Sequence, residues 1–123
     1  MERIEEFVID GKNFVYIDFS GIITNDELSE MVEAVISVIE KYPPDNSLYT
    51  ITNIDNTRFD AEARKIMADY MIHNNAYIKH GAVIGLDGIK KIMATSTFKM
   101  SGRTNMQFAF SKEQAIELLL KQD

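Results

Sequence analysis

The chain has 123 residues, of which 46% are hydrophobic, and this suits one domain with an ordinary apolar core. It contains no cysteine, which excludes disulfide frameworks, thiolate zinc sites and cysteine nucleophiles. The formal net charge of -6 argues against general nucleic-acid binding, because such binding depends on neutralising phosphates.

Two β-rich segments open the chain and predict a hairpin. Residues 4–9 and 13–19 are rich in β-branched and aromatic side chains, and Asp10-Gly11-Lys12 separates them. An Asp-Gly pair at such a junction is a strong hairpin signal. We therefore expect the first two strands to be antiparallel neighbours.

The first helix has a clear start and a wide apolar stripe. Thr24 and Glu27 form a T-x-x-E capping box. Apolar residues then recur at helical spacing over residues 28–39. Ala34 and Val38 widen the stripe beyond one face, so a homodimer contact through this helix is one possible use of the extra surface.

Strands and helices alternate through the rest of the chain. Residues 47–53 predict a third strand, a polar loop follows at 54–58, and a second helix is capped by either Thr57 or Asp60. The remaining elements are expected as a strand at 82–86, a helix from Gly88 to Ser101, a strand at 106–110 and a helix capped by Ser111 and Gln114 that reaches Leu120.

This order predicts an α/β fold with a mixed, mostly parallel sheet, an N-terminal β-hairpin and four helices. A strand followed by a helix and another strand implies a right-handed parallel crossover, with helices covering the sheet. A ferredoxin-like fold is the alternative, but it uses two helices where this chain signals four.

Three segments carry a family resemblance: YTITNIDNTRFDAEARKIM, HGAVIGLDGIKKI and FAFSKEQAIELLL. With the opening hairpin, they resemble the SpoIIAA-like family, relatives of the STAS domain. The resemblance covers nearly the whole chain and implies one domain over residues 1–123. It also implies a non-enzymatic regulatory or protein-interaction module that binds a protein partner through the loop and helix after the third strand.

The position that STAS regulators use for phosphorylation departs from the family pattern. Those proteins carry an Asp-Ser-Ser-Gly motif at the start of the helix, where a partner kinase phosphorylates a serine. The matching stretch here is residues 60–63, Asp-Ala-Glu-Ala, which has no hydroxyl, and Thr57 is the nearest one. The resemblance implies that the partner-binding residues are Asp55, Thr57, Arg58, Asp60 and Glu62.

A second candidate site lies at the fourth strand's carboxyl end. Free N–H groups at the start of the following helix attract anions, and lysines lie in its first turn. Against this, an aspartate in the turn would repel an anion or cap the helix itself. The predicted anion- or ligand-binding residues are Gly85, Asp87, Gly88, Lys90 and Lys91.

The alternative function is a small-molecule or lipid-binding domain, with an apolar or anionic site between the second and third helices. Methionines adapt to irregular ligands, and four fall on these helices: Met67, Met71, Met93 and Met100. SpoIIAA-like proteins are also similar in fold to lipid-carrying CRAL-TRIO domains, which favours this alternative.

The third helix also suggests a peripheral membrane contact. Residues 79–103 contain five Lys or Arg and one Asp, a local charge of +4 on an acidic chain. Phe98 lies near Lys91 and Lys99, away from the Ile89 side of the helix that we expect to be buried. An exposed aromatic flanked by lysines suits an acidic lipid surface, unless the helix bends and turns Phe98 inward.

No catalytic residue, metal or cofactor is predicted. The only histidines, His73 and His80, lack a metal-ligand spacing, and the aspartates fall at turns or strand ends, where they favour capping. No apolar run approaches the roughly 20 residues of a membrane helix. The N-terminus lacks a basic leader followed by an apolar core, so we expect a cytoplasmic protein.

Overall fold

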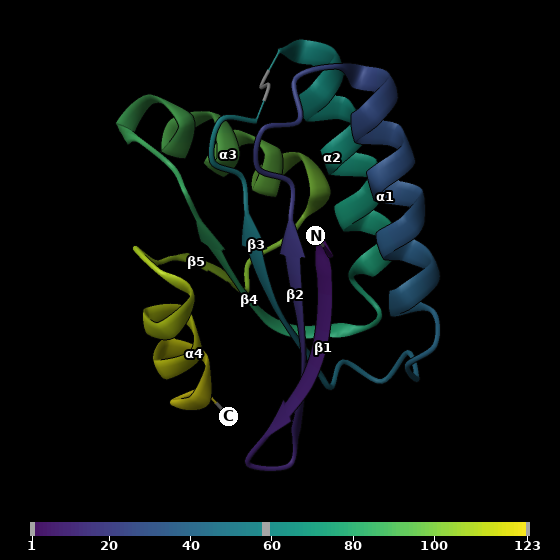
Figure 1. Ribbon diagram of the computed structural model, residues 1–123, viewed down its shortest axis with the longest axis vertical. Helices are drawn as coiled ribbons and strands as arrows, with labels where there is room; N and C mark the ends of the chain where they lie inside the picture. The colour runs from purple at the N-terminus through teal and green to yellow at the C-terminus, as the bar shows by residue number, and fades with distance from the viewer. Residues whose placement is uncertain (1, 58–59, 123) are drawn as a thin grey trace.

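The computed structural model describes residues 2–57 and 60–122, which form an α/β structure (Figure 1). Its elements, in chain order, are β1 (Ile4–Ile9), β2 (Lys12–Asp18), α1 (Asn25–Ile39), β3 (Leu48–Asn53), α2 (Ala61–Asn74), β4 (Ile78–Ile84), α3 (Gly88–Ser101), β5 (Met106–Phe108) and α4 (Lys112–Leu120). The order matches the one expected from the sequence.

The five strands of the sheet lie side by side in chain order. β1 and β2 are antiparallel, and the other neighbours are parallel. Ile9 pairs with Lys12, so Asp10 and Gly11 form a two-residue turn with φ of 52° and 75°. These positive values are those of the turn that Asp-Gly favours, and the predicted hairpin and mixed sheet are confirmed.

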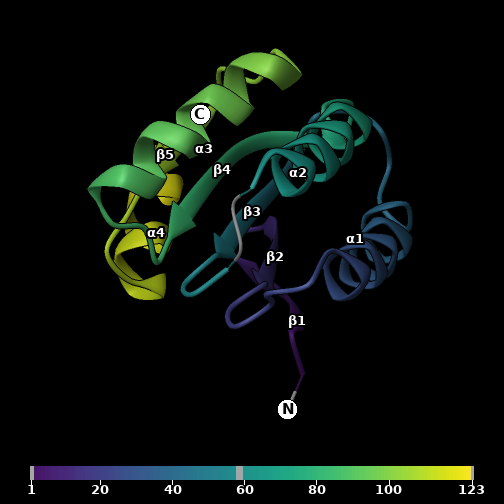
Figure 2. The same cartoon turned by 90° about the horizontal axis from the view of Figure 1, so that it is seen from above.

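Helices cover the two faces of the sheet unequally. α1, α2 and α3 lie on one face with α2 in the middle, and α4 packs on the other face over β3 and β4 (Figure 2). β2 alternates accordingly, with Val15 and Ile17 facing the three-helix layer and Phe14 facing the α4 side. Burial on both faces explains why apolar side chains follow one another in the central strands, as at Phe14-Val15 and Ala82-Val83-Ile84.

Side chains cap each helix at its N-terminus. Thr24 accepts from the Glu27 N–H (3.2 Å) and Ser111 from the Gln114 N–H (3.1 Å), as the two predicted capping boxes require. Asp60 accepts from the Ala63 N–H (2.8 Å) and caps α2. Asp60, rather than Thr57, is therefore the cap that the sequence left undecided.

β4 begins and ends earlier than the sequence predicts. It starts at Ile78, opposite Leu48, rather than at Ala82. Gly81 lies inside the strand. The position requires glycine, because a Cβ there would meet the Met106 sulfur at 2.5 Å. Gly85 ends the strand with φ of 86°. Gly81 therefore allows close packing within the sheet, and Gly85 alone forms the turn that ends the strand.

Candidate functional site

The loops that follow the parallel strands β3 and β4 lie at one edge of the sheet. We call this surface the rim and define it as loop residues 53–57, the turn at 85–87 and the first turn of α2 from Asp60 to Ala63. Parallel strands bring their following loops to one edge, which is where α/β proteins commonly bind ligands and partners.

Internal hydrogen bonds hold the loop after β3. The Asn53 Oδ1 accepts from the Asp55 N–H (3.0 Å), and the Asp55 carbonyl accepts from the Gly21 N–H (2.9 Å). Asn56 adopts a φ of 53°, a left-handed conformation that asparagine tolerates well. These contacts hold the backbone of the loop, so the exposed Asp55 side chain projects from a defined point of the rim.

The predicted partner-binding residues have different environments. Asp55 and Glu62 are exposed, and Glu62 accepts from the Asn25 side chain (2.8 Å), which ties α2 to α1. Thr57 is buried, and its hydroxyl donates to the Phe19 carbonyl (3.0 Å). In this conformation that hydroxyl serves the fold, and neither a partner nor a kinase reaches it. Arg58 lies outside the described residues.

The turn after β4 packs directly on the loop after β3. A Cβ at Gly85 would lie 2.6 Å from the Asp55 backbone nitrogen and 2.7 Å from the Asn53 Oδ1. Only glycine permits this approach together with a φ of 86°. Gly85 therefore joins the two loops into one continuous surface.

The predicted anion site at the start of α3 is occupied by the protein's own carboxylate. The Asp87 side chain accepts from the Lys90 N–H (2.9 Å), in the position where an anion would bind a helix N-terminus. Gly88 is exposed and Lys90 half-buried. The Lys91 ammonium lies over the Phe108 ring, 5.7 Å from its centroid. This arrangement favours helix capping over anion binding.

A small cavity lies between α2, α3 and the sheet, in the place where a ligand was expected. Its volume is about 40 Å³, enough for roughly one or two water molecules. Pockets for small organic ligands hold about 300 Å³ or more. Met67 and Met71 are among the residues that line the cavity, so in this conformation they pack the interior and leave no room for an acyl chain.

The cavity wall contains a buried arginine, Arg103, which is one of the positive charges counted in residues 79–103 and which the sequence did not place inside the protein. Arg103 is 7% exposed, and its guanidinium donates to the Met71 carbonyl (2.9 Å) and to the Asn75 side chain. Burial lowers the pKa of Arg103, and burial also raises the pKa of the neighbouring Tyr70 hydroxyl. Gly102, in a left-handed C-cap, returns the chain so that the Arg103 N–H donates to the Phe98 carbonyl (2.9 Å). In the sequence, Gly102 at the end of the predicted helix was the feature that could have indicated this change of chain direction.

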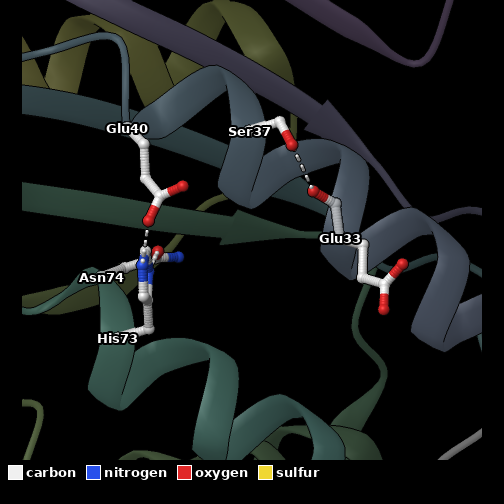
Figure 3. A network of polar contacts seen from close by, with 5 residues as sticks. All are labelled: Glu33, Ser37, Glu40, His73 and Asn74. Carbon is white, nitrogen blue, oxygen red and sulfur yellow. Dashed lines mark hydrogen bonds and ion pairs between the residues drawn. The ribbon is translucent and has the colours of Figure 1, made fainter.

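A histidine links the C-terminal ends of α1 and α2 (Figure 3). The His73 Nδ1 lies 2.9 Å from the Asn74 Oδ1, and its Nε2 lies 3.0 Å from a Glu40 carboxylate oxygen. The ring stacks on Tyr77 with centroids 5.7 Å apart. Both polar neighbours are acceptors, so the doubly protonated imidazolium can donate to each. The hydrogen bond to Asn74, followed by that to Glu40, raises the pKa of His73.

This linkage predicts a small pH dependence of stability. Because the folded-state pKa of His73 is raised, its contribution is complete below the unfolded pKa of 6.5 and is lost as pH rises through the folded pKa. We expect His73→Gln to lower the free energy of unfolding by at most about 1 kcal/mol at pH ~6, and by less at pH ~8. Urea unfolding at both pH values measures the difference, and an equal loss at both would contradict the protonated pair.

Metal-ligating side chains do not gather within residues 2–57 and 60–122: no group of three or more is placed to hold an ion. His73 pairs with Glu40, and the His80 ring lies 6.0 Å from the Tyr49 ring on β3. Within the same ranges, no helix combines the length and the apolar character that crossing a bilayer requires.

α3 has the opposite orientation from the one that its apolar residues predicted. Phe98 packs inward, with its ring centroid 5.9 Å from that of Phe108, whereas Ile89, Ile92 and Met100 are exposed. The prediction that Phe98 is exposed is therefore wrong. α3 turns the side that carries Phe98 toward the sheet, which differs from the expected orientation by about half a turn of the helix.

Neither known protein-family models nor characterised proteins give a match to this sequence.

Proposed function

We propose that the chain is a non-enzymatic regulatory or protein-interaction module of the SpoIIAA-like or STAS type, acting in the cytoplasm. It binds a protein partner through the rim. The observation that carries this proposal is the hydrogen-bonded loop after β3, which presents Asp55 beside the turn after β4.

A preformed loop favours binding, because ordering a flexible segment would subtract from the affinity. The loop's hydrogen bonds are made within the protein, so its exposed carboxylate is available to an outside group. Asp55, Glu62 and Asp87 give the rim an acidic surface, which fits a partner with basic side chains. The fixed charge of Glu62 stands near the position where related regulators acquire a phosphate.

The alternative of a small-molecule or lipid carrier has less support. The cavity between α2 and α3 is about 40 Å³, and the start of α3 is capped by Asp87. An apolar ligand would require α2 and α3 to separate, which would expose Arg103 and the methionines packed there, and an anion would have to displace the Asp87 side chain.

Reversing the rim's charge should abolish partner binding without unfolding the protein. Asp55→Arg combined with Glu62→Arg changes two exposed carboxylates and leaves the Asp60 cap intact. In quantitative affinity purification from the source cells, we expect a specific partner to be depleted at least ~10-fold by these changes.

The matched control is Glu30→Arg combined with Glu33→Arg, which makes the same charge change on exposed positions of α1. It should retain the partner. If both double variants lose the same proteins, the effect is one of net charge, and if neither loses any, the rim is not the contact surface.

A further inference from the structure

α3 exposes three large apolar side chains, although Phe98 packs inward and Met93 is half-buried, and the residues that it buries fully are small. Ile89, Ile92 and Met100 are 75%, 73% and 56% exposed. The buried positions are Ala94, Thr97 and Ser101. Amphipathic helices of globular proteins show the reverse arrangement, because burial of large apolar groups stabilises the fold. The outward face of α3 is therefore built to be covered by something other than this domain.

An aromatic residue from another element extends this surface. Phe110, in the connection from β5 to α4, is 86% exposed. The Lys91 ammonium lies 5.6 Å from its ring centroid and so joins it to the first turn of α3. We call Ile89, Ile92, Met100 and Phe110 the α3 patch. α3 lies on the far side of α2 from α1, at the outside of the helical layer (Figure 2).

The charge around the α3 patch is positive, although the protein is acidic. Residues 88–101 contain three lysines and no Asp or Glu. Asp87 caps the start of α3 and Glu113 follows Phe110, but exposed acidic side chains are more numerous on α1, at Asp26, Glu27, Glu30, Glu33 and Glu40. Pairing of two copies through α3 would bring six lysines together, which disfavours a dimer at this face. The occupant that complements the patch is anionic and accepts apolar side chains.

We propose that the α3 patch docks the protein on the surface of an anionic lipid bilayer. Ile89, Ile92 and Phe110 enter the headgroup region, while Lys90, Lys91 and Lys99 meet the lipid phosphates. Helices with an apolar face and lysines at its edge lie in the bilayer interface in this way. The outward side of a single helix is convex, and a bilayer receives a convex ridge without a matching groove. The α3 patch adjoins the rim at the start of α3, but it shares no residue with the rim.

Vesicle binding tests the proposal directly. The full chain is sedimented with vesicles of phosphatidylcholine alone or with about one third phosphatidylserine. We expect binding to the anionic vesicles only, with binding reduced at least ~10-fold by Ile89→Asp with Ile92→Asp. Lys90→Gln with Lys99→Gln should weaken it several-fold and reduce its dependence on salt.

Two controls keep the result specific. Val8→Asp with Ile72→Asp adds the same charges at exposed apolar positions on β1 and α2 and should bind as wild type does. Thermal melts by circular dichroism confirm that each variant is folded. The proposal is overturned if the wild type does not bind anionic vesicles, or if both Asp pairs weaken binding equally. It is also overturned if the wild type sediments as a dimer and the α3 variants sediment as monomers.

Discussion

Gly85→Ala is expected to destabilise the protein by about 2–4 kcal/mol. Two costs combine at this position. The backbone has φ of 86°, a conformation that L side chains rarely adopt, and the new Cβ would lie 2.6 Å from the Asp55 backbone nitrogen. The atom met is backbone, so it cannot move aside by a rotamer change. Relief requires the loops after β3 and β4 to separate, which would also disturb the rim.

Two other glycines separate these costs. Gly21 has φ of 75°, and a Cβ added there would have nothing within 4 Å, so Gly21→Ala reports the backbone conformation alone, about 1–2 kcal/mol. Gly88 has neither constraint, and Gly88→Ala should be neutral or slightly stabilising. Urea unfolding followed by circular dichroism compares the three. If Gly85→Ala and Gly21→Ala lower the free energy of unfolding equally, the loops after β3 and β4 are not in close contact at Gly85.

Local chemistry made much of the fold predictable. Asp10-Gly11 required a tight hairpin, and Thr24 with Glu27 marked the start of α1, because both signals act through neighbouring backbone groups. Gly81 and Gly85 look alike in sequence, yet one makes room for Met106 and the other turns the chain. Which of two glycines ends a strand depends on partners distant in the chain, and these have no local signature.

The orientation of α3 escaped prediction for a related reason. Apolar periodicity identifies a face but says nothing of what covers it, and here Ile89 and Ile92 face outward. At the rim, the sequence correctly placed Asp55 and Glu62 at the surface after β3, because turn and helix-start positions are usually exposed. It placed Thr57 there too, whereas a single hydrogen bond to Phe19 holds that side chain inside.

Arg103 is an unusual interior residue because its side-chain hydrogen bonds, among the described residues, go to two neutral oxygens and the Met106 sulfur rather than to a carboxylate. The two oxygens are the Met71 carbonyl in the last turn of α2 and the amide oxygen of Asn75, which follows that helix. The carbonyl end of a helix carries partial negative charge, and this favours a cation placed there. The guanidinium thereby connects the ends of α2 and α3, which are also joined by a hydrogen bond from the Asn75 side-chain N–H to the Ser101 carbonyl (3.1 Å).

Arg103→Met is expected to lower the free energy of unfolding by about 2–4 kcal/mol, since it removes the guanidinium donor from the buried Met71 carbonyl and from the half-buried Asn75 amide oxygen. Arg103→Lys keeps the charge but lacks the forked guanidinium that reaches both oxygens, so it should lower the free energy of unfolding by about half as much.

Arg3 provides the matched control. It donates to the Asp18 and Ser20 carbonyls from an exposed position, where water replaces it, and Arg3→Met should cost less than about 1 kcal/mol. Urea unfolding decides between two opposing terms. If Arg103→Met proves neutral or stabilising, the cost of burying the charge exceeds what its hydrogen bonds contribute, and the junction of α2 with α3 depends on apolar packing instead.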